Sequence, residues 1–250
     1  MAGFAVESQV VGYAQNNLKP GSTAIGSQFV PLTGDRVDLM DIIPNGYEDG
    51  VCEGTIISQQ VDGRGVLTEG SMYFWYDIPG EEEGTKELYG WLDTGDEPLL
   101  RDAQTVQPGG AWWMEGTSED EYVTSSGQVA SGAPVQVFLK FGSTFVVNPT
   151  PVAINFNDDD SDGKFIAADG YEDGVCEGTI ISQQDDGRGV LVEGSMYFWY
   201  DIPGEEEGTK ELYGWLDVGD EPVVNQLKPG EGLWVEGTST DEYLSFPSAL

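Results

Sequence analysis

The sequence predicts an all-β protein built from two tandem β-sandwich-like domains, and three observations carry this prediction. Short runs rich in Val, Ile, Thr, Tyr, Phe and Trp recur about every ten residues between Gly, Pro, Asp and Asn. No window of 12 or more residues holds the i, i+3, i+4, i+7 apolar stripe of an amphipathic helix. Most of the sequence also occurs as two similar repeats, and the length of one repeat matches that of an independently folding domain.

The internal duplication sets the predicted domain boundaries. Residues 46–100 and 170–224 align without a gap and differ at 5 of 55 positions. Their offset is 124, whereas the flanking matches, 18–23 with 139–144 and 112–123 with 233–244, have an offset of 121. The unit is therefore about 120–125 residues long, too long for a solenoid repeat or a propeller blade. We expect one domain over 1–129 and a second over 130–250.

The expected strands follow from the β-favouring runs. They cover 54–60, 65–70, 71–77, 87–93, 111–116, 121–125, 135–141, 143–147 and 152–157. Residues 73–92 read as a hairpin with a polar tip at 77–84, "DIPGEEEG". Met72, Phe74 and Tyr76 should face one side of it, and Tyr73 and Trp75 the other.

The charge balance excludes several classes of partner. The chain has 45 acidic residues, 10 basic residues and no histidine, for a net charge of −35. Nucleic acid and anionic membrane surfaces would repel such a chain, and no stretch approaches the roughly 20 apolar residues of a membrane span. The balance suits cation binding, a highly soluble extracellular protein, or life in high salt. The first residues lack a signal peptide, which fits a cytoplasmic protein or a mature secreted chain.

The residue types also argue against an enzyme. Without histidine there is no His-based triad, and most zinc and copper sites are excluded. Cys52 and Cys176, one per repeat, are expected to be buried thiols, with a bridge between repeats or subunits as the alternative. No pair of carboxylates can be singled out among 45 acids. We therefore expect a protein without catalytic residues.

One acidic stretch, "DDDSDGKFIAAD" at 158–169, resembles an EF-hand-type calcium loop, most closely the dockerin variant, which also ends in Asp. Two features depart from that family: position 12 is the shorter Asp, and both flanks read as strands or turns instead of helices. The resemblance implies the following ligands at positions 1, 3, 5, 7 (through the carbonyl) and 12: Asp158, Asp160, Asp162, Lys164 and Asp169.

The alternative is that so acidic a chain matches this pattern by composition alone. However, Gly163 at position 6, Phe165 at position 8 and an acid at position 12 are three further conditions. The stretch also falls where repeat 2 is three residues longer, and the corresponding residues of repeat 1, "PLTGDRVDLMD", lack the Asp ladder. We predict one calcium site, in the second domain.

The aromatic residues allow two interpretations. They could stack on sugar rings at the surface, or they could be the core and hairpin-packing residues on which small β-domains depend. The alternation in "YFWY" turns at least half of them inward, so we favour the core. The residues concerned are Trp112, Trp113, Trp234, Tyr73, Trp75, Trp91, Tyr197, Trp199 and Trp215.

Several short motifs, taken together, resemble a poorly characterised group of secreted bacterial β-domain proteins. They are "VVGY" (10–13), "FVPL" (29–32), "YFWY…GW" (73–91), "QPGGAWW" (107–113) and "SGQV" (126–129). Repeat 2 lacks "VVGY" and ends in "PSAL". The resemblance implies a secreted or cell-surface location and a structural or adhesive role.

These observations lead to a function hypothesis with one alternative. The chain is expected to be a non-enzymatic extracellular structural protein, a self-assembling surface or filament subunit stabilised by calcium. The alternative is a glycan-binding adhesin or lectin-like module that uses surface Trp and Tyr. For assembly, the N-terminal segment "ESQVVGYAQ" (7–15) could complete the sheet of the next subunit.

Overall fold

The computed structural model is an all-β protein, as the sequence predicts. It describes residues 11–18, 21–31, 35–46, 52–60, 67–116, 121–129, 133–139, 142–157, 165–170, 176–184, 191–237 and 241–248. The first half holds β1 (Val11–Asn17), β2 (Gly21–Ile25), β3 (Val37–Asp38), the 3-10 turn η1 (Leu39–Asp41), β4 (Ile43–Asn45), β5 (Cys52–Gln60), β6 (Leu67–Pro79), β7 (Lys86–Leu92), β8 (Thr105–Val106), β9 (Trp112–Gly116) and β10 (Tyr122–Gln128).

The second half repeats this series from β11 onward. Its strands are β11 (Val135–Phe138), β12 (Gly142–Val147), β13 (Ile154–Asn155), β14 (Ala167–Asp169), β15 (Cys176–Gln184), β16 (Leu191–Pro203), β17 (Lys210–Asp217), β18 (Gln226–Leu227), β19 (Gly232–Gly237) and β20 (Tyr243–Phe246). The described residues of the runs expected at 65–70 and 71–77 belong to one 13-residue strand, β6.

Both halves use the same strand order. A five-stranded sheet runs β2-β9-β5-β6-β7 in the first half and β12-β19-β15-β16-β17 in the second. A three-stranded sheet runs β1-β10-β4 and β11-β20-β14, and a two-stranded pair is β3-β8 and β13-β18. Each core takes side chains from both the five-stranded and the three-stranded sheet, so the two sheets pack face to face.

Aromatic side chains dominate both cores. Trp112, Trp199 and Trp215 are among the largest fully buried side chains, and such rings contribute most of the apolar area that a small core can remove from water. The indole N–H of Trp91 donates to the carbonyl of Ile42 at 2.9 Å, and that of Trp215 donates to Ile166 at 2.7 Å. These two pairs are related by the 124-residue offset, so the same bond orients the same ring in each half.

The halves meet at a seam, defined as the contact of residues 109–111 with residues 145–147. Gly110 pairs with Val146 in an isolated antiparallel bridge. The amide of Val147 donates to the carbonyl of Gly109 at 2.8 Å, and the amide of Ala111 donates to that of Phe145 at 3.2 Å. The seam therefore continues a backbone hydrogen-bond pattern from one half into the other.

Contacts across the seam are reciprocal. A β-carbon at Gly109 would collide with Val137 and touch Pro149 of the second half. A β-carbon at Gly230 would collide with Gln28 and Asn16 of the first half. The 121-residue offset relates 109 to 230, 16 to 137 and 28 to 149, so the halves face each other about an approximate two-fold axis.

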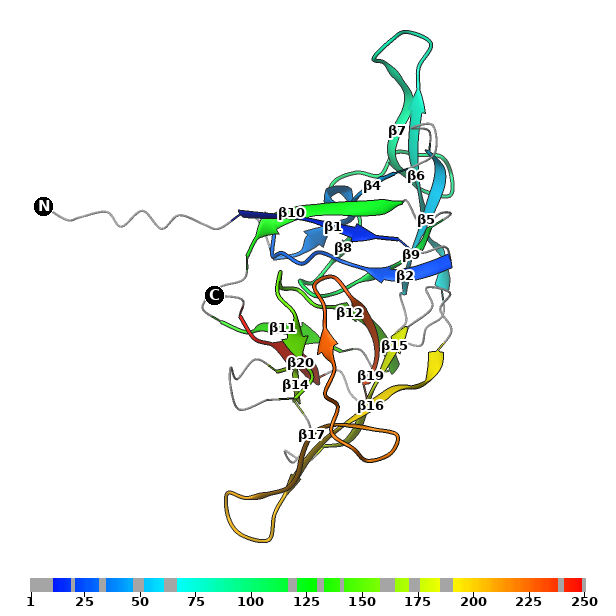
Figure 1. Ribbon diagram of the computed structural model, residues 1–250. Coiled ribbons are helices and arrows are strands. Elements are labelled where there is room, and N and C mark those ends of the chain that lie inside the picture. Colours follow the sequence, from blue (N-terminus) through cyan, green and yellow to red (C-terminus); the bar gives the residue numbers. More distant parts are fainter. Residues whose placement is uncertain are drawn as a thin grey trace, which may run out of the picture.

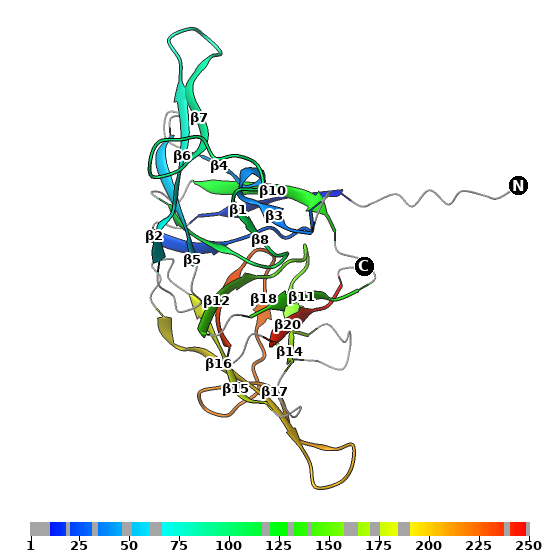
Figure 2. The same cartoon turned by 180° about the vertical axis from the view of Figure 1, so that it is seen from behind.

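The two long hairpins, β6–β7 and β16–β17, project from opposite ends of the molecule as a result (Figures 1 and 2). We call the parts of these hairpins that lead to and from the tips the arms: the first arm is Met72–Tyr89 and the second is Met196–Tyr213. Residues 69–93 and 193–217, which contain the arms, are identical in sequence. The molecule thus presents the same hairpin in two opposite directions.

Candidate functional site: the arms and the flanks of the predicted calcium loop

The tip of each arm is a hydrogen-bonded loop that exposes three glutamates. In the first arm the amide of Gly80 donates to the carbonyl of Thr85 at 2.9 Å, and the Thr85 hydroxyl donates to the carbonyl of Glu82 at 2.7 Å. Gly84 has a φ of +80°, which suits glycine. The second arm repeats all three features at Gly204, Thr209 and Gly208. The polar tip that the sequence predicts is thus confirmed on both arms.

One face of each arm carries an exposed tyrosine backed by tryptophan. Tyr89 is 56% exposed and packs edge-to-face on Trp75, with ring centroids 5.2 Å apart. The Lys86 ammonium lies 5.9 Å from the centre of the Tyr89 ring and forms an ion pair with Asp77. The second arm has the same arrangement at its corresponding residues. Each arm therefore offers an aromatic ring flanked by one cation and one anion.

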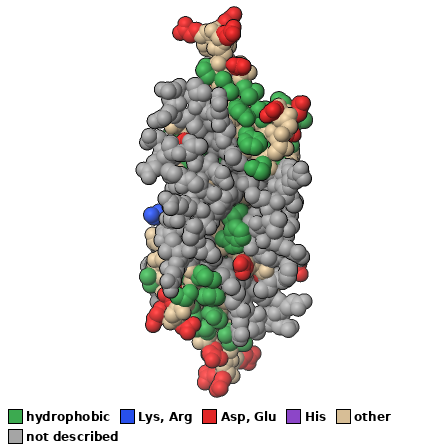
Figure 3. Space-filling model, turned by 90° about the vertical axis from the view of Figure 1, so that its right-hand side faces the viewer, with side chains coloured by type: hydrophobic (Ala, Val, Ile, Leu, Met, Phe, Trp, Pro, Cys, Tyr) green, Lys and Arg blue, Asp and Glu red, His purple; other side chains and the backbone are tan. Residues whose placement is uncertain are grey.

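The opposite face of each arm is apolar. Met72, Phe74, Tyr76 and Ile78 alternate with the buried Tyr73 and Trp75, as predicted, and are only half-buried. Hydrophobic side chains accordingly lie beside the acidic tip at both ends of the molecule (Figure 3). The arms thus combine a charged tip, an aromatic face and an apolar face.

The tryptophans belong mainly to the core, which agrees with the favoured interpretation. Trp75, Trp91, Trp112, Trp199 and Trp215 are at most 4% exposed, and Tyr73 and Tyr197 are equally buried. Trp234 is half-buried and packs edge-to-face on Phe145 at 4.5 Å. The side chain of Trp113 lies outside the described residues. Stacking of sugars on the buried rings is therefore wrong, because their faces are covered; the exposed aromatics of the arms are Tyr89 and its copy Tyr213.

Most of the predicted calcium loop lies outside the described residues. This applies to Asp158, Asp160, Asp162 and Lys164, so the calcium site stays a prediction. Among the residues that the structure does describe, no group of three or more His, Cys, Asp or Glu is placed to hold a metal ion.

The residue before the loop, Asn157, is fixed at the edge of β17. Its side-chain amide donates to the carbonyl of Trp215 at 2.8 Å and to that of Val223 at 3.0 Å, and its oxygen accepts from the amide of Trp215 at 2.6 Å. One side chain thus replaces a strand partner along this edge. The adjacent Gly214 has a φ of +119°, and a β-carbon there would lie 2.6 Å from the Asn157 oxygen.

The residue after the loop is also fixed. Phe165 pairs with Asn155 in a parallel bridge, and the amide of Ile166 donates to the carbonyl of Asn155 at 3.1 Å. The Phe165 ring lies edge-on to Tyr213 of the second arm, at 6.3 Å. Both flanks of the predicted loop are therefore anchored at the base of the second arm, and neither is a helix.

Asp169, the predicted ligand at position 12, is an exposed residue of β14. Its carboxylate accepts hydrogen bonds from the amide of Gly170 at 2.7 Å and from the hydroxyl of Tyr243 at 3.1 Å. This hydrogen bond raises the pKa of Tyr243 above its usual value, because it favours the protonated phenol. At about 3.3 Å per residue, the extended chain carries Asp169 about 13 Å from Phe165. Asp169 therefore lies on a strand and not at the start of a helix as in a helix–loop–helix, and its role as a calcium ligand stays a prediction.

The first half contains a pair of hydrogen-bonded carboxylates, Asp38 and Asp41, that the sequence does not predict. The buried Asp38 accepts from the amide of Met40 at 2.9 Å and from that of Asp102 at 2.7 Å. Arg101 bonds Asp41 at 2.8 Å, which raises the pKa of Arg101. Arg101 and Asp102 belong to the three-residue insertion of repeat 1, so this pair of carboxylates fixes that insertion to η1.

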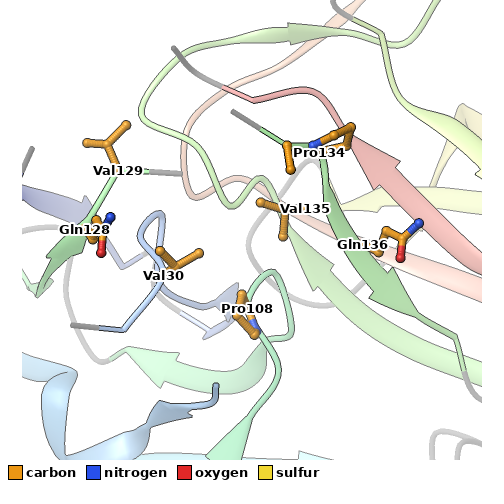
Figure 4. Close-up of a pocket in the computed structure, with 8 residues that line it drawn as sticks. Val30, Pro108, Gln128, Val129, Pro134, Val135 and Gln136 are labelled. Atoms are coloured by element: carbon orange, nitrogen blue, oxygen red, sulfur yellow. The ribbon is translucent and has the colours of Figure 1, made fainter. Parts of the chain in front are cut away.

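A cavity of about 360 Å³ lies beside the seam (Figure 4). Its side chains supply the amides of Gln128 and Gln136 and otherwise apolar groups, and none of the lining residues is titratable. It is lined by Val30, Pro108, Gln128, Val129, Ala133, Pro134, Val135 and Gln136.

Comparison with known proteins gives no relative. No family model matches the chain, no curated protein matches it, and no solved structure matches its fold. Within the described residues, no helix has the length and apolar character needed to cross a membrane.

Proposed function

We propose that this protein is a non-enzymatic structural protein of the cell exterior, a self-assembling subunit of a surface layer or filament that calcium stabilises. The observation that carries the proposal is the presence of two sequence-identical arms at opposite ends of one body. A subunit with one binding surface can only pair, whereas a subunit that repeats the surface in opposite directions can extend an assembly from both ends.

The chemistry of the arms suits contact between macromolecules. Each arm exposes a tyrosine supported by tryptophan, and its reverse face is apolar. Tyrosine and tryptophan are favoured at interfaces because they bring large area with few rotatable bonds. The glutamate tips and the net charge of −35 oppose association between copies, so assembly should need divalent cations or salt to screen that repulsion.

The location and the cation are part of the same proposal. The acidic chain and its resemblance to secreted β-domain proteins favour the cell exterior. The loop at 158–164 is the proposed calcium site, and its anchored flanks would transmit the effect of a bound ion to Asn157 and Phe165 at the base of the second arm.

A second candidate function is glycan binding, and one observation favours it. Tyr89 and Tyr213 are 56% and 49% exposed, and each lies beside a Lys–Asp ion pair. Sugar recognition commonly combines an aromatic face with charged groups that bond hydroxyls. In this case the two arms would make the protein a bivalent lectin-like adhesin.

Electron microscopy of the purified protein, with calcium and with a chelator, tests the first proposal. Ordered polymers in calcium are expected. The double variant Tyr89→Ser/Tyr213→Ser should abolish them, whereas either single variant should stop at small oligomers, since one arm remains. Dispersed wild-type particles that bind sugars on a glycan array, with loss of binding in the double variant, would favour the adhesin. Dispersed particles without glycan binding would refute both.

A further inference from the structure

Among the strands that the structure describes, β1 has a partner on one side only. It pairs antiparallel with β10 along its whole length, from Val11 opposite Gln128 to Asn17 opposite Tyr122. In the sheet order β1-β10-β4 it is an outer strand. The predicted donation of this strand to another subunit is therefore not what the described part shows, because residues 11–15 already belong to the sheet of their own chain.

The hydrogen-bond pattern shows which groups of β1 point outward. The amide and carbonyl of Gln128 both bond to Val30, on the far side of β10, at 2.9 and 3.0 Å. Antiparallel pairing alternates between bonded and non-bonded pairs, so Gln128 does not bond to Val11. The amide of Leu18 donates to Glu121 at 2.9 Å, which fixes the same alternation from the other end.

It follows that Gly12, Ala14 and Asn16 bond to β10, and that the backbone groups of four residues face away from it. Within the described part of the chain, nothing hydrogen-bonds to these outward groups. Their side chains are exposed as well, with Tyr13 at 70% and Val11 at 59%. The four residues are Val11, Tyr13, Gln15 and Asn17.

The corresponding edge in the second half is capped at Phe138. There, β11 pairs with β20 in a register that turns the backbone amide and carbonyl of Phe138 away from β20. The side chain of Gln107 bonds both of these groups. The Gln107 amide donates to the Phe138 carbonyl at 2.7 Å and accepts from the Phe138 amide at 3.0 Å. Pro134 stands immediately before β11 and cannot donate a hydrogen bond.

The first half has neither the glutamine cap nor the proline at the corresponding positions. By the 121-residue offset, Tyr13 takes the place of Pro134, and Lys228 takes the place of Gln107 opposite Asn17. A lysine has donors but no acceptor, so it cannot reproduce the two-way bond that glutamine makes. Strand β1 also has no bulge, proline or charge, which are the usual protections of an edge.

The charge distribution favours a second copy of this chain as the occupant. Like charges oppose contact between copies of a chain with a net charge of −35, so a neutral surface favours self-association where no cation screens the repulsion. Residues 8–18, which contain β1, hold no charged side chain, and residues 122–157 hold only Lys140. Strand β1, with the neighbouring uncharged β10, therefore offers an edge at which two copies can meet without placing like charges opposite each other.

We propose that two copies of the chain pair through the open edges of β1, antiparallel about a two-fold axis at Ala14. In this register Val11 lies opposite Asn17 of the partner, and Tyr13 opposite Gln15. All four outward-facing residues then form bonded pairs, about eight hydrogen bonds in total, and the two three-stranded sheets join into one of six strands. The inference deepens the proposed self-assembly but uses a surface separate from the arms.

The test measures molar mass by light scattering over about 1–100 µM, the range in which a weak dimer dissociates. It uses the variant Tyr89→Ser/Tyr213→Ser, so that contacts through the arms do not interfere. A mass of twice 27.0 kDa is expected at the upper concentrations. In this background, adding Tyr13→Glu/Gln15→Glu places like charges opposite each other in the proposed register and should leave only the 27.0 kDa monomer.

The matched control is Tyr13→Lys/Gln15→Glu, which changes the same two exposed positions but places opposite charges across the axis. It should remain dimeric. Tyr13→Pro, which copies Pro134, removes one outward donor and should raise the dissociation constant at least tenfold, with an unchanged circular dichroism spectrum. These results do not depend on whether polymers form, so they separate this inference from the proposal about the arms.

Three outcomes would overturn the inference. The first is a monomer at every concentration. The second is a dimer that survives the two-glutamate change, which would place the contact elsewhere. The third is a monomer that becomes a dimer only after removal of residues 1–10, which would show that the chain's own N-terminal segment occupies the edge.

Discussion

The contact between Asn157 and Gly214 can be measured by changing the same glycine in both halves. Gly214 and Gly90 correspond by the 124-residue offset and have φ values of +119° and +123°. Alanine at either position pays the same backbone strain, about 1–3 kcal/mol. Among the described residues, the new β-carbon meets an obstacle only at Gly214, the Asn157 oxygen at 2.6 Å, and no described atom lies within 4 Å of it at Gly90.

The difference between the two variants therefore isolates the Asn157 contact. Displacing Asn157 breaks three hydrogen bonds to the backbone of Trp215 and Val223. At about 1 kcal/mol of net stability each, Gly214→Ala should cost about 2–3 kcal/mol more than Gly90→Ala. For a chain of this length that corresponds to a further drop of about 4–12 °C in the melting temperature.

Urea unfolding followed by tryptophan fluorescence measures both changes, provided that the slope of free energy against urea stays constant. The variant Asn157→Ala completes a double-mutant cycle. In its background, Gly214→Ala should cost no more than Gly90→Ala does in the wild type. Equal losses for the two glycine variants in the wild-type background, within about 0.5 kcal/mol, would refute the assignment of Asn157 as the partner of this edge.

Three further predictions concern packing, pH and calcium. Gly12→Val should destabilise the first half by about 1–3 kcal/mol in urea unfolding, because its β-carbon would overlap the Phe29 ring; Phe29→Ala in the same chain should recover part of the loss. Burial, and secondarily the charge of Asp93, raises the pKa of Tyr73 above 10.0. The stability that the protonated Tyr73 phenol contributes is therefore present below pH 10 and is lost as the pH rises through the raised pKa. In urea unfolding at alkaline pH, the free energy of unfolding should fall less steeply with pH in Tyr73→Phe. Calorimetry should detect calcium binding and a calcium-dependent rise in melting temperature, both lost in Asp160→Asn; no heat up to millimolar calcium would contradict the site.

The hairpins were predictable because the local pattern is sufficient for them. Alternation from Met72 to Tyr76 assigns the two faces, and the tip of Gly and Glu residues marks the turn. Burial of Tyr73 and Trp75 follows from the same alternation. The core role of the tryptophans was favoured for a related reason, since a sheet with one buried face turns alternate aromatics inward.

The long-range arrangement was not predictable, because no local pattern encodes it. Strand β1 pairs with β10, more than 100 residues later, and both strands are polar and uncharged. The glycines of two motifs, Gly12 in "VVGY" and Gly127 in "SGQV", face each other in this ladder, and a β-carbon on either would collide with Phe29 of "FVPL". These motifs are thus parts of one packing unit, although each is uninformative alone.

The role of Asn157 was hidden for a different reason. Asparagine is common in turns, and its position before an acidic run gives no hint that its side chain bonds a strand edge 58 residues away. The sequence did locate the insertion in repeat 2, and the structure places its flanks at the base of the second arm. The calcium site itself stays a prediction.

The reciprocal contacts at Gly109 and Gly230 bear on how such a chain can arise. A single unit of about 120 residues that carried this surface would be self-complementary, so two separate copies could pair before any gene fusion. Fusion then holds the units at an effective concentration of about millimolar. Under that tether the interface tolerates divergence, and each copy is free to specialise: Gln107 of the first unit caps the strand edge of the second unit at Phe138, whereas the first unit's own edge has no such cap.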